Sequence, residues 1–204
     1  MPSIYQLKPH FQNLLRPGVK RLYARGVSAN QVTLAAAVVS VLLGVMLALF
    51  QQRWLFALIP LWMLLRMALN AVDGMLAREF GQQSKLGAYL NELCDLIADS
   101  ALYLPFALLP GVSPLLVVLL VLLALISEYA GVLGPMVGAS RRYDGPMGKS
   151  DRAFCFGVVA AGVVSGLLPA SWSNGLFALM AVLLLYTLYN RVRQGLAEAA
   201  TSVA

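Results

Sequence analysis

The sequence has few of the residues on which covalent cross-linking and general-base chemistry commonly depend. Its 204 residues include two cysteines and one histidine. Cys94 and Cys155 lie in apolar stretches and match no metal or redox spacing, so we expect neither a disulfide nor a metal–thiolate site. His10 is far along the chain from the acidic residues, and we expect it to be neither a base nor a ligand.

Charge is also scarce, because only 12% of the residues are charged while 60% are hydrophobic, and the mean hydropathy is +0.76. This composition is typical of a polytopic membrane protein. A helix needs about 20 apolar residues to cross the hydrocarbon core of a bilayer. The sequence therefore predicts an all-α protein with six transmembrane helices, at Val32–Phe50, Trp54–Arg78, Leu86–Leu109, Pro114–Val137, Ala153–Leu168 and Trp172–Asn190.

The first residues lack the uninterrupted apolar core of a signal peptide, because five basic residues are scattered through them. Apolar residues recur between these bases at helical spacing. Residues 1–27 are therefore predicted to form an amphipathic segment on an anionic membrane surface, and an ordinary basic arm beside the membrane is an equal alternative. Ser28 and Gln31 have the spacing of a capping box and predict where the first membrane helix begins. Residues 28–190 would then form one six-helix membrane domain, and residues 191–204 a tail.

The basic residues predict the orientation. All but Arg53 and Arg66 of the 15 lysines and arginines fall in the N-terminal arm, in the loops after the second and fourth helices, or after the sixth helix. In a six-helix plan these segments share one side of the membrane. By the positive-inside tendency, we expect this multi-pass protein to have both termini and these loops in the cytoplasm.

Polar residues interrupt the second and third predicted helices at regular spacing. Asn70, Asp73, Gly74 and Ala77 lie along one stripe of the second helix, and Gly87, Asn91, Asp95 and Asp99 lie along one stripe of the third. The short connecting loop makes the two helices antiparallel, so the stripes should face each other at the cytoplasmic end. Carboxylates at membrane depth are costly and are kept where they pair, bind ions or do chemistry. The alternative is that these polar residues only form interhelical hydrogen bonds that hold the bundle together. The number of polar residues on the two stripes favours a functional site.

This stretch resembles the CDP-alcohol phosphotransferases, whose signature is D-x2-D-G-x2-A-R-x8-G-x3-D-x3-D. The chain reads Asn70-x2-Asp73-Gly74-x2-Ala77-Arg78-x8-Gly87-x3-Asn91-x3-Asp95, so six of the eight fixed positions match and every spacing does. Asn30 and Thr33 extend the resemblance to the first helix. The family's plan of six helices with both ends inside agrees with the plan predicted above.

The resemblance implies an enzyme of phospholipid synthesis. It would displace CMP from CDP-diacylglycerol, or from another CDP-alcohol, by the hydroxyl of a small polar acceptor with or without a phosphate. One or two Mg²⁺ or Mn²⁺ ions would be bound by Asp73, Asp95, Asn70 and Asn91, and Asp95 would also be the catalytic base. The residues expected to bind the nucleotide are Gly74, Ala77, Arg78, Gly87, Asn30 and Thr33.

Two departures from the signature weaken the implied metal site. Asn70 and Asn91 stand at metal-ligand positions, and an amide oxygen attracts a hard dication less strongly than a carboxylate does. One ion would then bind weakly or only together with the diphosphate, or Glu92 or Asp99 would supply the missing charge. The surrounding residues are typical of a bacterial branch of the family, which implies an integral protein of the bacterial inner membrane with a cytoplasmic active site.

The loop from Ser140 to Arg152 is the expected acceptor side of that site. Its basic residues would bind an acceptor phosphate or would only be topology charges near anionic lipid, and these residues are Arg141, Arg142, Lys149 and Arg152. Deeper in the bundle, Arg66 and Asp99 are predicted at the same level, about 18 Å below the surface, and should form an ion pair. Glu128 is the competing partner for Arg66.

Two other functions are alternatives to the enzyme. A protein of the same fold could bind nucleotide or lipid without turnover, although the match at Asp73, Arg78 and Asp95 favours catalysis. A transporter is disfavoured because the polar residues form one cluster and the second half of the chain does not resemble the first. Membrane lipids and a second copy of the chain, in a homodimer, are the expected partners, and nucleic acid is not.

Overall fold

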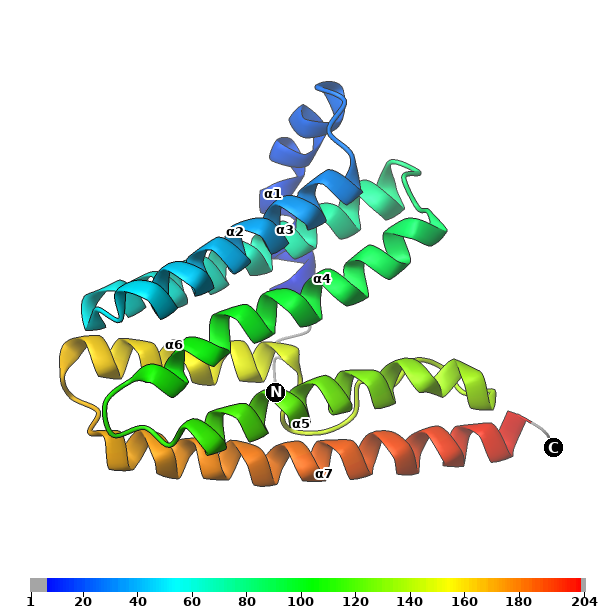
Figure 1. Ribbon diagram of the computed structural model, residues 1–204. Coiled ribbons are helices and arrows are strands. Elements are labelled where there is room, and N and C mark those ends of the chain that lie inside the picture. Colours follow the sequence, from blue (N-terminus) through cyan, green and yellow to red (C-terminus); the bar gives the residue numbers. More distant parts are fainter. Residues whose placement is uncertain (1–6, 203–204) are drawn as a thin grey trace. The chain divides into compact units, whose positions relative to one another are not determined.

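The computed structural model describes residues 7–202, and side chains for residues 11–201, so the prediction for His10 lies outside the described side chains. Every regular element within residues 7–202 is helical (Figure 1). The elements are α1 (Leu7–Ala24), α2 (Ala29–Phe50), η2 (Arg53–Ala57), α3 (Leu58–Glu79), α4 (Lys85–Tyr103), η3 (Leu104–Leu108), α5 (Pro114–Leu133), η4 (Gly134–Val137), α6 (Lys149–Ser165) and α7 (Ala170–Ser202). The all-α prediction is confirmed for this part of the chain.

A helix occupies each of the six predicted ranges, but within residues 7–202 four helices are long and apolar enough to cross a membrane. These spans are Ala29–Phe50, Arg53–Glu79, Pro114–Val137 and Ala170–Thr201. The helix α4 carries Lys85, Glu92, Asp95 and Asp99 in its 19 residues, and α6 has only 17 residues, so neither has the length and composition of an ordinary span. Six crossings therefore stay a prediction.

The last helix is longer than the apolar pattern predicted. We expected the sixth helix to end at Asn190, whereas α7 continues to Ser202. The residues after Arg193 are mostly glutamine, leucine, alanine and glutamate, which favour a helix without being apolar enough to extend a membrane run. A hydropathy pattern alone therefore does not predict this extension of α7.

The sequence prediction for the start of α2 is confirmed. The backbone N–H of Gln31 donates to Ser28 Oγ at 3.2 Å, and the backbone N–H of Ser28 donates to Gln31 Oε1 at 2.9 Å. These reciprocal bonds form the capping box and satisfy two backbone donors at the beginning of the helix.

The chain divides into two compact units, which are described separately. Unit 1 comprises Met1–Leu43 and Leu61–Asp99, and unit 2 comprises Gly44–Pro60 and Ser100–Ala204. In unit 2, α5 and α7 lie side by side (Figure 1). The core of unit 2 is aromatic, because the rings of Tyr103 and Phe156 stack with centroids 3.9 Å apart and Phe106 and Phe177 pack around Phe156. Such ring pairs stabilise a core beyond the effect of their buried area.

Close helix packing in unit 2 requires glycine at position 44. A Cβ atom there would overlap the backbone carbonyl of Ala101, which cannot move as a side chain could. We expect Gly44→Ala to lower the free energy of unfolding by ~1–3 kcal/mol, as overpacking does. Thermal unfolding in detergent measures the change. The matched control is Gly175→Ala in α7, where a Cβ meets nothing within 4 Å, and it should leave the stability unchanged or raise it. Equal effects of the two substitutions would contradict this account of the packing.

Candidate functional site

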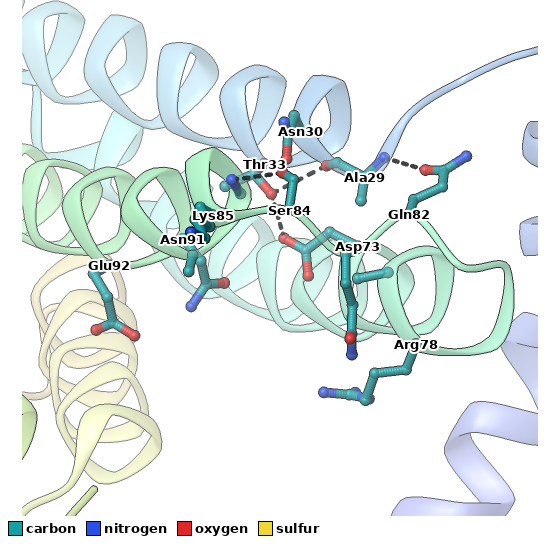
Figure 2. A pocket seen from close by; sticks show the side chains of 15 residues that line it. Ala29, Asn30, Thr33, Asp73, Arg78, Gln82, Ser84, Lys85, Asn91 and Glu92 are labelled. Carbon is teal, nitrogen blue, oxygen red and sulfur yellow. Dashed lines mark hydrogen bonds between the residues drawn. The ribbon is translucent and has the colours of Figure 1, made fainter. Parts of the chain in front are cut away.

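A pocket of ≈ 720 Å³ lies within unit 1, between residues of α2, α3, α4 and the loop before α4 (Figure 2). Eight residues predicted from the sequence line it, namely Asn30, Thr33, Asp73, Gly74, Ala77, Arg78, Gly87 and Asn91. The structure therefore brings together the polar stripes of the second and third predicted helices. It also adds pocket residues that the sequence reasoning did not assign, among them Gln82, Gln83, Ser84 and Lys85.

Two of the predicted metal ligands, Asn70 and Asp95, are not among the residues that line this pocket. Asn70 precedes Asp73 by one helical turn of α3, and Asp95 follows Asn91 by one turn of α4. Both are partly buried. Glu92, one of the two alternative sources of negative charge, does line the pocket, whereas Asp99 does not.

The carboxylate of Asp73 is buried and held from α2. Thr33 Oγ1 lies 2.8 Å from Asp73 Oδ2 and donates a hydrogen bond to it, and the same hydroxyl lies 3.1 Å from the carbonyl oxygen of Ala29 (Figure 2). Asp73 is only 6% exposed. This contact fixes the orientation of the carboxylate and gives Thr33 a role that its sequence position alone did not define.

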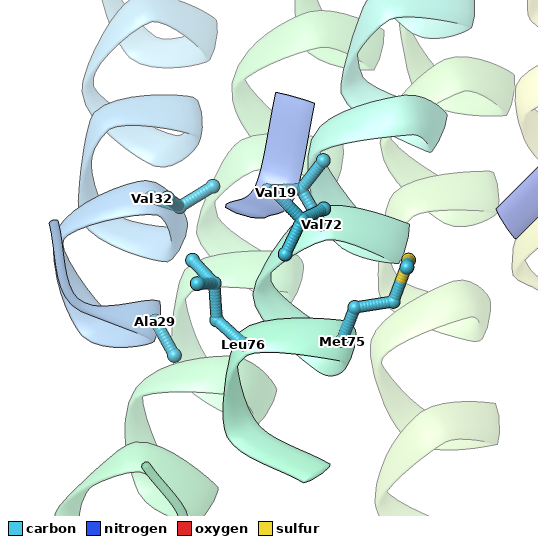
Figure 3. Packing of buried hydrophobic residues seen from close by; sticks show 6 residues of the cluster. All are labelled: Val19, Ala29, Val32, Val72, Met75 and Leu76. Carbon is cyan, nitrogen blue, oxygen red and sulfur yellow. The ribbon is translucent and has the colours of Figure 1, made fainter. Parts of the chain in front are cut away.

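Packing below the pocket fixes α2 and α3 against α1. Six buried residues of the three helices form one apolar cluster (Figure 3), made of Val19, Ala29, Val32, Val72, Met75 and Leu76. Ala77, which lines the pocket, packs partly against this cluster. On the surface, the guanidinium of Arg16 in α1 donates to both oxygens of Glu79 in α3, at 3.2 and 3.0 Å. The helix α1 is therefore a packed part of unit 1, and its predicted contact with lipid stays a prediction.

The loop before α4 closes one end of the pocket. Gln82 Oε1 accepts a hydrogen bond of 2.7 Å from the backbone N–H of Ala29, and Ser84 Oγ accepts one of 2.9 Å from the backbone N–H of Gly87. These bonds satisfy backbone donors at the first turns of α2 and α4.

The small residues of the signature leave room for polar side chains. A Cβ atom on Gly87 would lie 2.8 Å from Asn30 Oδ1 and 3.0 Å from Ser84 Oγ, and one on Gly74 would lie 2.7 Å from an Arg78 nitrogen. A larger residue at either position would therefore force the side chain of Asn30 or Arg78 to move from its place at the pocket.

The predicted ion pair between Arg66 and Asp99 is confirmed. Arg66 is 4% exposed, and its Nη1 donates to Asp99 Oδ1. Its Nη2 also donates to Asp95, at 3.1 Å to Oδ1 and 3.2 Å to the backbone oxygen. Residue spacing does not predict this second contact, which connects the proposed catalytic carboxylate to the buried arginine.

Glu128, the competing partner proposed for Arg66, pairs with other arginines within unit 2. Its carboxylate lies 3.0 Å from Arg152, 3.4 Å from Arg191 and 3.8 Å from Arg141. Arg152 is 1% and Arg191 2% exposed, so the pairs are buried. Arg191 was counted only as a topology charge in the sequence. Glu128 is a single acid within an apolar helix and needs a basic partner there. This need is the sequence signal that could have identified Arg191.

The predicted acceptor residues have different environments within unit 2. Arg141 and Arg152 approach Glu128, and Lys149 begins α6. Arg142 is instead held by Asp144, at 2.8 and 3.0 Å, and by Glu198 of α7. Its hydrogen bonds with Asp144 raise the pKa of its guanidinium, so it stays charged. Arg142 therefore ties the loop to the extension of α7.

The oxygen atoms at the pocket are suited to bind a divalent ion weakly. Among the described residues, no group of three or more His, Cys, Asp or Glu side chains could hold a metal. Asp73 and Asn91 both line the pocket and offer one carboxylate and one amide oxygen, which are hard ligands suited to Mg²⁺ or Mn²⁺.

The family model for CDP-alcohol phosphatidyltransferase matches residues 27–201. The chain belongs to this family. It is 47% identical to the inner membrane protein YnbA of Escherichia coli, over 94% of this chain and 95% of that protein. It is also 35% identical to the archaetidylinositol phosphate synthase of Aeropyrum pernix, over 48% of this chain and 50% of that enzyme.

The fold agrees with solved structures of the Mycobacterium tuberculosis phosphatidylinositol phosphate synthase. The structure with CDP-DAG bound superposes with a TM-score of 0.70 at 20% identity, covering 88% of this chain and 92% of that one. The complex with manganese and citrate gives a TM-score of 0.70 at 21% identity, covering 88% and 87%. The CDP-alcohol phosphatidyltransferases are divalent-metal-dependent transferases of phospholipid biosynthesis, so this chain is a membrane enzyme.

Replacing only one residue of the buried Arg66–Asp99 pair should strongly destabilise the protein. We expect Arg66→Leu or Asp99→Leu alone to lower the free energy of unfolding by ~3–5 kcal/mol, because each leaves a buried charge without its main partner. The double variant should recover a large part of the loss. Unfolding in detergent, analysed as a double-mutant cycle, measures the coupling.

The exposed pair provides the control for this cycle. Arg16 and Glu79 have side chains 40% and 36% exposed, and replacing both by alanine should change the stability by no more than ~0–1 kcal/mol. Additive losses in the Arg66 and Asp99 cycle would show that the buried pair contributes no coupling.

Proposed function

We propose that the protein transfers a phosphatidyl group from CDP-diacylglycerol to the hydroxyl of a small polar acceptor that carries a phosphate, and releases CMP. The observation that carries this proposal is the pocket of unit 1, where Asp73, Gly74, Ala77, Arg78, Gly87 and Asn91 of the family signature converge. Its volume of ≈ 720 Å³ lies within the ~300–1,000 Å³ of typical small-molecule sites. The donor is proposed from the structural relative that has CDP-DAG bound.

The pocket residues suit a nucleoside diphosphate. Gly74 and Gly87 leave space beside Arg78 and Asn30, and Lys85 adds a second cation to the lining. The guanidinium of Arg78 can pair with phosphate oxygens, and the amide of Asn30 can bond polar edges of the cytidine. Asp73, Asn70 and Asn91 would hold a divalent ion, and the ion would add positive charge beside the diphosphate.

Asp95 is the proposed base. An oxygen of the acceptor hydroxyl forms a bond to the phosphorus that carries the diacylglycerol, and the acceptor's proton passes to the Asp95 carboxylate. The bond between that phosphorus and the bridging oxygen breaks, and its electron pair leaves with CMP. Arg66 fixes the position of the Asp95 side chain, so the carboxylate need not reorganise during the reaction.

The cluster around Glu128 in unit 2 supports an anionic acceptor. Three guanidiniums, from Arg141, Arg152 and Arg191, surround one carboxylate, and Arg191 Nε and Ser127 Oγ are buried with no hydrogen-bond partner among the described residues. Guanidiniums are well suited to bind a phosphate anion. The archaeal and actinobacterial relatives are named as synthases of inositol phosphate lipids, which agrees with a phosphorylated acceptor. Lys149 is a further proposed contact, and Arg142 positions the loop.

The cellular setting follows from the relatives and the charge pattern. The protein that is 47% identical is an inner membrane protein, so we assign this chain to the same membrane. By the positive-inside tendency, the basic loops favour a cytoplasmic side for both termini and the active site. A homodimer in the membrane is the proposed assembly.

Replacing the base tests the chemistry. Asp95→Asn should lower the rate of CMP release by ~10²–10⁴-fold, because the hydroxyl loses its proton acceptor, while CMP binding persists. The assay uses purified protein in detergent, CDP-diacylglycerol, Mn²⁺ and a panel of phosphorylated and free polyols. Glu79→Gln, at the exposed end of α3, is the control and should react normally. Near-normal turnover in Asp95→Asn would exclude Asp95 as the base, and a wild-type protein that binds CMP but releases none from CDP-diacylglycerol with any acceptor would favour a non-catalytic binding protein.

The acceptor site has its own test. Arg191→Gln should raise the KM for a phosphorylated acceptor by ~10-fold or more while leaving the KM for CDP-diacylglycerol within about twofold, because a charge-assisted hydrogen bond to the acceptor is lost. Arg193→Gln, at an exposed position of α7, is the control and should leave both KM values nearly unchanged. Loss of affinity for donor and acceptor alike in Arg191→Gln would refute a specific acceptor role.

A further inference from the structure

Gln82 connects two walls of the unit 1 pocket through its side-chain amide. Its Oε1 accepts a hydrogen bond of 2.7 Å from the backbone N–H of Ala29, and its Nε2 donates at 3.4 Å to the backbone oxygen of Val27. Ala29 begins α2, whereas Gln82 lies in the loop before α4, 53 residues further along the chain. The two bonds therefore hold the start of α2 against that loop.

The residues that follow these bonds line the pocket from both walls. On the α2 side, Asn30 and Thr33 lie in the first turns of the helix. On the α4 side, Ser84 Oγ accepts a hydrogen bond of 2.9 Å from the backbone N–H of Gly87. The walls approach closely at Asn30 and Gly87, because a Cβ atom on Gly87 would lie 2.8 Å from Asn30 Oδ1. A change in their separation would therefore change the shape of the pocket.

A glycine with a positive φ precedes each of the bonded segments. Gly26 has a φ of 76° and comes directly before Val27, and Gly81 has a φ of 68° and comes directly before Gln82. A Cβ atom on either glycine would meet no atom of the described residues within 4 Å, so packing does not fix these positions. Glycine is also the residue whose backbone changes conformation at the least cost. Both segments can therefore turn at these glycines unless the bonds of Gln82 hold them.

We propose that Gln82 is a positioning residue of the nucleotide site, which holds the start of α2 and the loop before α4 at the separation that a cytidine diphosphate group needs. This inference rests on the proposed function and deepens it. With both bonds made, the pocket is preformed and binding does not have to order the loop. Without them, part of the binding free energy is used to bring the walls together. The donor and CMP then bind more weakly, while the chemical step of the bound donor is unchanged.

The capping box at the same helix start provides a matched comparison. Gln31 Oε1 accepts a hydrogen bond of 2.9 Å from the backbone N–H of Ser28, so Gln31 and Gln82 each satisfy one backbone donor beside the first turn of α2. Gln31 is exposed, is not among the residues that line the pocket, and bonds only within its own stretch of chain. A residue that only stabilised the helix start would behave as Gln31 does.

The affinity for CMP tests the proposal. Isothermal titration calorimetry on purified protein in detergent with Mn²⁺ gives the Kd for CMP in the wild type, Gln82→Met, Gln82→Ala and Gln31→Ala. Methionine has nearly the length of glutamine and cannot make these two bonds, and alanine shows whether the methionine side chain itself obstructs the pocket. Thermal unfolding checks the fold of each variant, and hydrogen exchange at the backbone N–H of Ala29 checks that the bond is lost.

Both substitutions of Gln82 should raise the Kd for CMP and the KM for CDP-diacylglycerol by ~10-fold or more, with kcat and the acceptor KM within ~3-fold of the wild type. Gln31→Ala should lower the unfolding temperature and leave the Kd for CMP within ~2-fold. Normal CMP affinity in either Gln82 variant, equal losses of affinity in the Gln31 and Gln82 variants, or Gln82 variants that do not fold would overturn the proposal. CMP binding needs no turnover, so absent CMP release by the wild type refutes the proposed function, while the CMP affinities still decide the role of Gln82.

Discussion

Charge buried among apolar helices must be neutralised within the protein, and this constraint governs both units. In unit 1, Arg66 is satisfied by Asp95 and Asp99, and in unit 2 the Glu128 carboxylate is satisfied by Arg152 and Arg191. An isolated charge at such depth is costly, so each cluster can exist only if its helices stay in register. The apolar cluster that packs α1 against α2 and α3, and the aromatic core of unit 2, maintain that register.

The same constraint explains why small residues surround the pocket. Polar side chains that bind a charged substrate need space, and a helix bundle provides it only where residues have little or no side chain. Gly74 and Gly87 face Arg78 and Asn30, and any larger residue would displace these polar groups. The signature is therefore a packing pattern as much as a chemical one, since its glycines and its charged residues depend on each other.

Much of unit 1 could be predicted from the sequence, because helical periodicity and the antiparallel arrangement place residues by level and face. The capping box at Ser28, the convergence of Asp73 with Asn91 and the pairing of Arg66 with Asp99 follow from spacing alone. The contact between Arg66 and Asp95 did not, because a guanidinium has two donor edges and spacing identifies only one partner. The extension of α7 and the role of Arg191 were missed because hydropathy and charge counts ignore what a residue packs against.

The two asparagines make the site less negative than the family signature implies. An amide in place of a carboxylate keeps an oxygen donor and removes a negative charge. A less negative site repels a diphosphate less and attracts dications less. Under the proposed function, the substrate's own phosphates would then be the principal anions of the site, and the metal and the donor would depend on each other for binding.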